Sequence, residues 1–203
     1  RLGLLMKQKI IDALIEIEAI KFGKFKLKSG IISPIYIDLR IIVSYPQMLK
    51  NIAQGLMGLA ESIEYDSIAG IPYTALPIAT AYSLESGKPM IYARKEKKEY
   101  GTAQQIEGIW KKGDTVLIID DLITDGASKS ETFEVFESAG LVVNDIVILI
   151  DREQGGKENI QKTGHCVHSL ISIFEVLDRI KSLNKLDKQR YNEILAFLNK
   201  KVK

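Results

Sequence analysis

Short apolar segments that alternate with helical segments constrain the fold of this 203-residue chain more than any other feature. Segments rich in Ile and Val on both faces are typical of strands that are buried on both sides. Helices between such strands predict a parallel sheet covered on each face, so we expect an α/β fold. The predicted strands are 67–71, 89–93, 115–119, 145–150 and 165–170, and the predicted helices are 46–61, 75–86 and 128–139, with one more after Gly156.

The two ends of the chain follow other patterns. Apolar residues recur with helical spacing over 4–20, two short strands joined by a turn are predicted in 21–40, and 173–200 is typical of two helices. A length near 200 residues predicts one domain, 1–203. Its expected parts are an N-terminal helix and small hood (1–45), a core (46–170) and a helical tail (171–203).

Composition excludes several classes of protein. The 28 Lys and Arg against 26 Asp and Glu leave a net charge of +2, which argues against binding nucleic acid through bulk electrostatics. A single cysteine cannot build a disulfide framework and fits a reducing compartment. The longest aliphatic run, 146–150, is too short to cross a membrane. We expect a cytoplasmic protein with neither a nucleic-acid nor a membrane partner.

Two adjacent carboxylates, Asp120 and Asp121, follow a buried strand in the segment VLIIDDLITDGASKSE (116–131). Ligands of open parallel sheets bind beyond the carboxyl ends of the strands, so a site is expected here. Neighbouring buried carboxylates repel each other and lose hydration, which favours a ligand that donates to both. The two hydroxyls of a ribose are such donors. An acid in a turn before an ordinary helix is the plainer alternative.

A polar loop follows the acid pair and leads into the predicted helix. Thr124, Gly126 and Ser128 offer hydroxyls and backbone amides at a helix N-terminus, which together suit a phosphate group. Ser128 and Glu131 have the spacing of a capping box, which predicts that the helix begins at Ser128. The acids and the loop are separated by about the length of a ribose 5-phosphate.

The order of apolar strand, acid pair, two apolar residues and Thr-x-Gly-x-Ser resembles the phosphoribosyl-pyrophosphate signature of the type I phosphoribosyltransferases. Members that act on 6-oxopurines carry a carboxylate at the position of Thr124, whereas orotate enzymes carry threonine. From about Phe22 to Leu177 the chain resembles the orotate phosphoribosyltransferases, above all the transferase half of their bifunctional members. The five matching segments, in the family's order, are KFGKFKLKSGIISPIYIDLR, GIPYTALPIA, RKEKKEYGT, VLIIDDLITDG and DREQGGKENI.

This resemblance implies the type I phosphoribosyltransferase fold and the transfer of ribose 5-phosphate from phosphoribosyl pyrophosphate to orotate. Mg²⁺ is the implied cofactor, held mainly by substrate oxygens and water rather than directly by the protein. The implied partners are a second copy of the chain, whose lid loop is shared across subunits, and an orotidine 5′-phosphate decarboxylase that is either fused or associated.

The segment RKEKKEYG (94–101) resembles the family's lid loop. By that resemblance Lys98 is the lysine most tied to catalysis, and Arg94 and Lys95 contact pyrophosphate. Tyr100 stands where most members have histidine, as in the bifunctional members, so no imidazole acts at that position. Cations in a lid suit a departing pyrophosphate, but a solvated charge run is the plainer interpretation.

The segment GIPYTAL (70–76) resembles the family's pyrophosphate-facing loop. Thr74 stands where many members have lysine, which removes one cation from the implied site. The family often has a cis peptide before this tyrosine, so the resemblance implies a cis bond between Pro72 and Tyr73. A simple turn with Gly and Pro is the alternative.

Two further segments are implied to face the pyrimidine. Lys28, Tyr36 and Ile37 match the part that closes over the ring, although a lysine on a surface hairpin has no need of a ligand. Arg152 follows a buried strand and suits a bidentate pair with the carboxylate of orotate. An ion pair between Arg152 and Asp151 is the structural alternative.

The resemblance thus implies two sets of site residues. The catalytic set is Lys98, Tyr100, Asp120 and Asp121. Asp125 is an unusual neighbour for a phosphate, and we expect its side chain to face solvent. The substrate-binding set is Lys28, Tyr36, Ile37, Tyr73, Thr74, Arg94, Lys95, Lys98, Tyr100, Asp120, Asp121, Thr124, Asp125, Gly126, Ala127, Ser128 and Arg152.

Two rival functions stay open at this point. The chain is compatible with a phosphoribosyltransferase for uracil or a purine, which a test of the accepted base separates from an orotate enzyme. It is also compatible with a non-catalytic sensor of the same fold. A sensor has no need of the lysines in 94–101.

Overall fold

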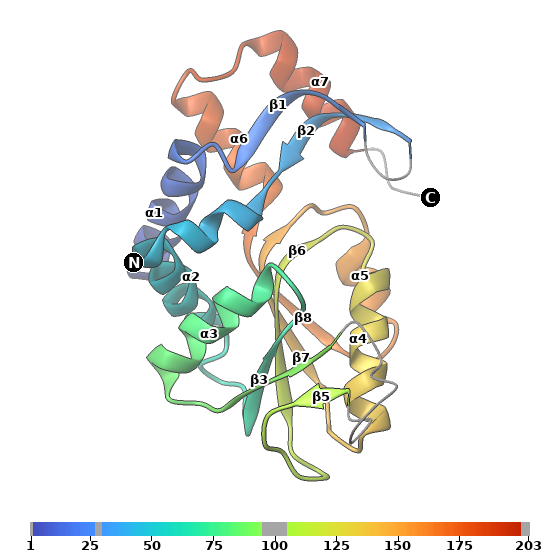
Figure 1. Ribbon diagram of the computed structural model, residues 1–203. Coiled ribbons are helices and arrows are strands. Elements are labelled where there is room, and N and C mark those ends of the chain that lie inside the picture. Colours follow the sequence, from blue (N-terminus) through green and yellow to red (C-terminus); the bar gives the residue numbers. More distant parts are fainter. Residues whose placement is uncertain (1, 27–29, 95–104, 200–203) are drawn as a thin grey trace.

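The computed structural model describes residues 2–26, 30–94 and 105–199 and contains two sheets (Figure 1). The larger has six strands in the order β5-β4-β3-β6-β7-β8, and all neighbours in it are parallel except β4 and β5. The chain therefore has the predicted α/β architecture. The strands of this sheet are β3 (Ser67–Gly70), β4 (Met90–Ala93), β5 (Ile106–Glu107), β6 (Val116–Ile123), β7 (Asp145–Asp151) and β8 (Cys166–Ser172).

Helices cover both faces of the large sheet because its strands are apolar on both sides (Figure 1). Along β6, Val116 and Ile118 pack in one cluster with Phe133, while Leu117 and Ile119 pack in the other. The first cluster lies under α4 and α5, and the second lies under α2 and α3. These helices are α2 (Pro46–Leu59), α3 (Ala75–Ser86), α4 (Ala127–Ser138) and α5 (Gly156–Gln161).

The hood is an antiparallel hairpin that forms its own two-stranded sheet, and its strands lie where the sequence predicted them. The C-terminal tail packs beside it at the top of the molecule (Figure 1), where α7 contacts β2. The division into 1–45, 46–170 and 171–203 stays a prediction. The elements of this region are α1 (Leu2–Glu16), β1 (Ile20–Lys26), β2 (Ile32–Ile37), the 3-10 helix η1 (Leu39–Ser44), α6 (Ile173–Ser182) and α7 (Lys188–Leu198).

The structure differs from the sequence prediction by more than two residues at two boundaries, and it contains one additional strand. The first helix ends at Glu16 rather than Ile20, because Glu18 adopts a left-handed conformation and the amide of Ala19 returns to the carbonyl of Leu14. The strand predicted over 115–119 continues to Ile123, because its backbone still pairs with β7 after the apolar pattern has ended. The short strand β5 was not predicted.

The predicted helix over 75–86 is confirmed, and Gly87 ends it in the left-handed conformation that the sequence indicated. No helix among the residues that the model describes is long and apolar enough to cross a membrane.

Gly70 is the last residue of β3 and precedes the turn before α3. A substitution there measures how tightly this junction is packed. A Cβ at Gly70 would lie 2.8 Å from the carbonyl oxygen of Ala75 and 2.8 Å from the Cβ of Ala79, neither of which moves freely. We expect Gly70→Ala to lower the free energy of unfolding by about 1–3 kcal/mol in urea denaturation.

The matched control is Gly58→Ala in α2, where an added Cβ meets no atom within 4 Å. Alanine is the better helix former, so this variant should be stabilised by roughly 0.5–1 kcal/mol. Equal stability of the two variants would contradict the close packing at Gly70.

Candidate active site

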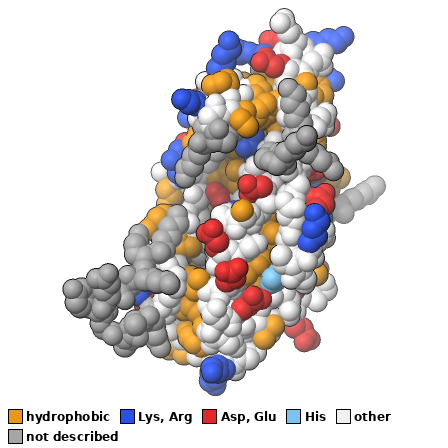
Figure 2. All heavy atoms as spheres, turned by 90° about the vertical axis from the view of Figure 1, so that its right-hand side faces the viewer, with side chains coloured by type: hydrophobic (Ala, Val, Ile, Leu, Met, Phe, Trp, Pro, Cys, Tyr) orange, Lys and Arg blue, Asp and Glu red, His pale blue; other side chains and the backbone are white. Residues whose placement is uncertain are grey.

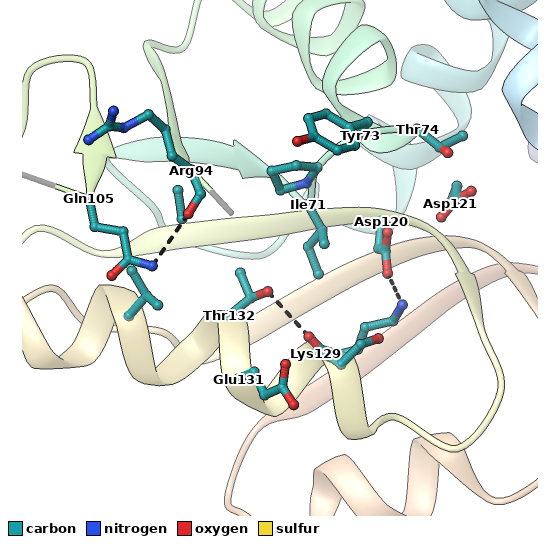
Figure 3. A pocket seen from close by; sticks show the side chains of 14 residues that line it. Ile71, Tyr73, Thr74, Arg94, Gln105, Asp120, Asp121, Lys129, Glu131 and Thr132 are labelled. Atoms are coloured by element: carbon teal, nitrogen blue, oxygen red, sulfur yellow. Dashed lines mark hydrogen bonds and ion pairs between the residues drawn. The ribbon is translucent and has the colours of Figure 1, made fainter. Parts of the chain in front are cut away.

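A cavity of about 410 Å³ lies at the carboxyl ends of β3 and β6 (Figure 3). This is the edge of a parallel sheet where ligands bind. The starts of α3 and α4 and the facing ends of β4 and β5 complete its wall. Of the predicted site residues, the cavity brings together Tyr73, Thr74, Arg94, Asp120, Asp121 and Ser128.

The acid pair lies at the centre of this wall. In Figure 3 Asp120 points toward α4, whereas Asp121 lies on the side of Thr74. Successive residues of a strand point to opposite faces, so adjacent acids on β6 necessarily reach two different parts of the cavity. Asp120 is only 2% exposed, and Asp121 is partly buried.

Lys129 on α4 forms an ion pair with Oδ2 of Asp120. The contact is an ion pair rather than a well-aligned hydrogen bond, because Oδ2 has no hydrogen bond of ordinary geometry among the described atoms. Burial, followed by the negative charge of Asp120 and hydrogen bonding to it, raises the pKa of Asp121 to about 7, and the charge of Lys129 opposes this shift. The pair therefore carries less negative charge near neutral pH than two ordinary carboxylates.

The sequence analysis did not single out Lys129, and it placed the start of α4 one residue too late. The helix begins at Ala127 after Gly126, and Ser128 makes no side-chain cap, so the predicted capping box of Ser128 and Glu131 is wrong. The Gly-x-x-Lys spacing from Gly126 was the available signal. A lysine there lies in the first turn of the helix and faces the end of the strand that precedes it.

The loop between β6 and α4 is held from behind by α5. Gly126 has a φ of 84°, and a Cβ there would lie 2.9 Å from the carbonyl oxygen of Gly156, so both its conformation and its packing require glycine. The side-chain amide of Asn159 donates to the carbonyl of Asp125 at 3.1 Å. This loop joins Asp121 to the N-terminus of α4. Ser128 lines the cavity, whereas the preceding loop residues do not: Thr124, Asp125, Gly126 and Ala127.

Asp125 is exposed, as expected, and it also has a local role. Its Oδ1 accepts a hydrogen bond from the backbone amide of Ala127 at 3.1 Å. An acid at this position therefore stabilises the first turn of α4, whose N-terminus carries partial positive charge.

Arg94 lies at the opposite rim of the cavity, at the end of β4. Its Nε is 3.1 Å from Oε1 of Glu107, and its backbone amide donates to the carbonyl of Gln105 at 2.9 Å. Arg94 and Gln105 both line the cavity, so the segment that joins them starts and finishes at this rim. The predicted residues Lys95, Lys98 and Tyr100 lie outside the described residues.

The peptide bond between Pro72 and Tyr73 is cis, as the resemblance implied. Tyr73 is 61% exposed beside the cavity, and Thr74 immediately precedes α3. The pyrophosphate-facing loop of the prediction therefore does contribute to the cavity wall.

The hood residues that the structure describes do not line this cavity. Tyr36 stacks on Phe25 with ring centroids 5.3 Å apart, and its hydroxyl accepts a hydrogen bond from Arg40 at 3.1 Å. Ile37 is the last residue of β2 and is partly buried. Lys28 lies outside the described residues.

Arg152 follows β7 directly and is buried, with 8% of its surface exposed. Its Nε and Nη2 have no hydrogen-bond partner among the described atoms, and burial lowers its pKa. Asp151 does not pair with it among the described ion pairs but accepts from the amide of Glu153 at 2.7 Å. A buried guanidinium without a partner is costly unless an anion binds it, which argues against the structural alternative.

These features define a class of site, in which one cavity offers adjacent carboxylates for a diol and a helix N-terminus for a phosphate. The buried Arg152, which does not line that cavity, can bind a further anion. Comparison with known proteins points to the same class of site. The sequence model of a protein family, described as "Phosphoribosyl transferase domain", matches residues 41–177. The chain is 44% identical over 191 residues to the uridine 5′-monophosphate synthase of Bos taurus, covering 93% of this chain and 40% of that protein.

Two further relatives narrow the assignment. Identity with the orotate phosphoribosyltransferase of Caenorhabditis elegans is 39% over 191 residues, covering 93% of this chain and 84% of that protein. The structure of Leishmania donovani UMP synthase gives a TM-score of 0.87 at 40% identity, covering 94% of this chain and 42% of that one. The chain belongs to the phosphoribosyl transferase family, in its orotate phosphoribosyltransferase branch. It spans about two fifths of the two synthases.

The raised pKa of Asp121 makes stability depend on pH. The unfolded chain releases this proton near an ordinary carboxyl pKa of about 4, whereas the folded protein holds it up to about pH 7. Ionisation therefore destabilises the fold as the pH rises between these values. We expect the melting temperature of Asp121→Asn, relative to the wild type, to increase between about pH 4 and pH 7.

Calorimetry across this pH range checks the prediction. Glu61→Gln, at an exposed position after α2, should give a profile parallel to that of the wild type. A constant difference between Asp121→Asn and the wild type would show that Asp121 titrates in the folded protein as it does in the unfolded chain.

Proposed function

We propose that the chain transfers ribose 5-phosphate from phosphoribosyl pyrophosphate to N1 of orotate, which yields orotidine 5′-phosphate and pyrophosphate. The bond from C1′ to the pyrophosphate oxygen breaks, its electron pair leaves with pyrophosphate, and a bond from orotate N1 to C1′ forms. The single observation that carries this proposal is the acid pair in a cavity directly before a helix N-terminus that is built around glycine.

In this proposal the ribose hydroxyls donate to Asp120 and Asp121. The 5′-phosphate binds beside the cavity wall at Ser128, on the amides and hydroxyls of residues 124–128, where the positive end of the α4 dipole favours an anion. The carboxylates also lie close to the anomeric carbon, where their negative charge stabilises the cationic character that develops on the sugar. Orotate N1 is an anion once it is deprotonated, so a strong protein base is not required.

Mg²⁺ fits this site as a substrate-bound ion. It prefers oxygen ligands and retains several waters, and the acid pair offers carboxylate oxygens beside the proposed diol. Among the described residues no group of three or more His, Cys, Asp or Glu could hold a metal ion alone. Pyrophosphate and ribose oxygens with water would therefore hold most of it. When bound, the ion supplies positive charge to the leaving pyrophosphate.

The lid and the dimer are proposals that rest on the family resemblance. Lys98, Lys95 and Arg94 would neutralise pyrophosphate and exclude water, with the segment 94–101 reaching into the site of a second copy. The position of Arg94 at the cavity rim supports this. Tyr100 would contribute without the pH dependence of a histidine.

Arg152 is the proposed partner of the orotate carboxylate, and Lys28, Tyr36 and Ile37 the proposed cover of its ring. The buried and unpaired Nε and Nη2 of Arg152 support the first assignment. We also propose a cytoplasmic location and a decarboxylase, fused or associated, that consumes the product. The larger size of the two synthase relatives is compatible with a second unit.

A spectrophotometric assay tests the proposed reaction. Orotate absorbance should fall only when phosphoribosyl pyrophosphate and Mg²⁺ are both present, and Asp120→Asn should slow the change by at least about tenfold, the loss of one charge-assisted contact. Uracil and hypoxanthine in place of orotate serve as controls. Pyrophosphate release with either of them but not with orotate would establish the rival transferase, and no release with any base would favour a sensor.

Arg152 allows a test of base recognition. Arg152→Gln removes the charge that faces the orotate carboxylate, so KM for orotate should rise by about tenfold or more while KM for phosphoribosyl pyrophosphate changes by less than about twofold. Arg152→Lys should recover only part of the loss, because lysine cannot form a bidentate pair.

Arg190→Gln, at an exposed position on α7, is the matched control and should leave both constants unchanged. An equal rise in both constants for Arg152→Gln would place Arg152 in the structure of the site rather than in contact with orotate.

A further inference from the structure

Lys129 is a buried cation in the cavity wall that the mechanism above leaves without a role. It is 9% exposed and lies in the first turn of α4. Glu131, Glu134 and Glu137 of the same helix are all exposed, and acidic side chains follow the middle of this face of the molecule (Figure 2). Lys129 nevertheless points inward to Asp120, as Figure 3 shows.

Stability alone does not explain this arrangement. Removing an ammonium and a carboxylate from water costs several kcal/mol, and their attraction in the interior often only offsets that loss. Well-packed apolar side chains at both position 120 and position 129 would often leave such a fold as stable or more so, whereas loss of Lys129 alone leaves a buried carboxylate unpaired. The fold therefore does not require an ion pair at this place, and the reason for the pair lies in what it does to the site.

Its effect on the acid pair is specific. The ammonium is paired with Oδ2 of Asp120 and so fixes the orientation of that carboxylate. Its charge also opposes the rise in the pKa of Asp121 and so keeps more of that group ionised near neutral pH. Both effects prepare the two acids to accept hydrogen bonds.

We propose that Lys129 is a positioning residue for the sugar, which orients Asp120 and supplies a resident positive charge so that the acid pair can accept the ribose hydroxyls before any divalent cation binds. The inference rests on the proposed function. It deepens that function by assigning recognition of the diol to three residues, Asp120, Asp121 and Lys129, rather than two.

Binding measured without a metal tests the proposal. Titration calorimetry in EDTA gives the affinity for ribose 5-phosphate and the affinity for inorganic phosphate. The ratio of these two affinities isolates the contribution of the sugar. We expect the wild type to prefer ribose 5-phosphate, and Lys129→Met to reduce this preference by about tenfold, the loss expected when one charge-assisted contact fails. Its affinity for inorganic phosphate should change by less than about twofold.

Two further variants separate positioning from packing. Lys129→Arg keeps the charge and should retain most of the preference. In an Asp120→Asn background Lys129→Met should have little further effect, because the lysine acts through Asp120. Lys112→Met, at an exposed turn before β6, is the matched control and should bind both ligands as the wild type does.

Each failure has a distinct meaning. A wild type that shows no preference for ribose 5-phosphate would contradict the sugar site and with it the proposed function. A wild-type preference that Lys129→Met retains in full would overturn this inference alone. Loss of folding or of phosphate binding in Lys129→Met would assign the lysine to the structure of the loop and would also overturn it.

Discussion

The burial of two neighbouring carboxylates at the end of β6 is the constraint around which the site is built. Like charges so close together, with little water, cannot both stay ionised without compensation. Alternation along the strand sends Asp120 toward α4 and Asp121 toward α3, and Lys129 compensates the first. The site therefore depends on the packing of α4 against the sheet as much as on the acids themselves.

Much of the core could be predicted because local pattern and global fold agree there. Apolar runs placed the strands, and Gly87 ended its helix where expected. The prediction failed where backbone pairing continued beyond the apolar pattern, as in β6, and where the helix start shifted by one residue. The sequence analysis also left Lys129 unassigned, because no local pattern by itself shows that its side chain turns inward to Asp120 and into the cavity wall.

The candidate site likewise contains residues whose positions could be predicted from the sequence and residues whose positions could not. Asp120, Asp121 and Ser128 follow one another along a strand, loop and helix, so their proximity is a local property that the sequence carries. The position of Tyr36 depends on how the hairpin docks on the rest of the molecule, and no local pattern encodes it. Neither could the unpaired state of Arg152 be read from the sequence, since an ion pair with Asp151 was equally compatible with their adjacency.

The contact between β2 and α7 has a consequence for the order of folding. The hairpin precedes the whole of the large sheet in the sequence, whereas the helix that packs on it follows all of the sheet. Contacts between segments so far apart in the sequence form slowly, because the intervening loop has to be closed first. The region proposed to cover the pyrimidine should thus be the last to acquire its native packing, after the sheet and its acid pair are in place.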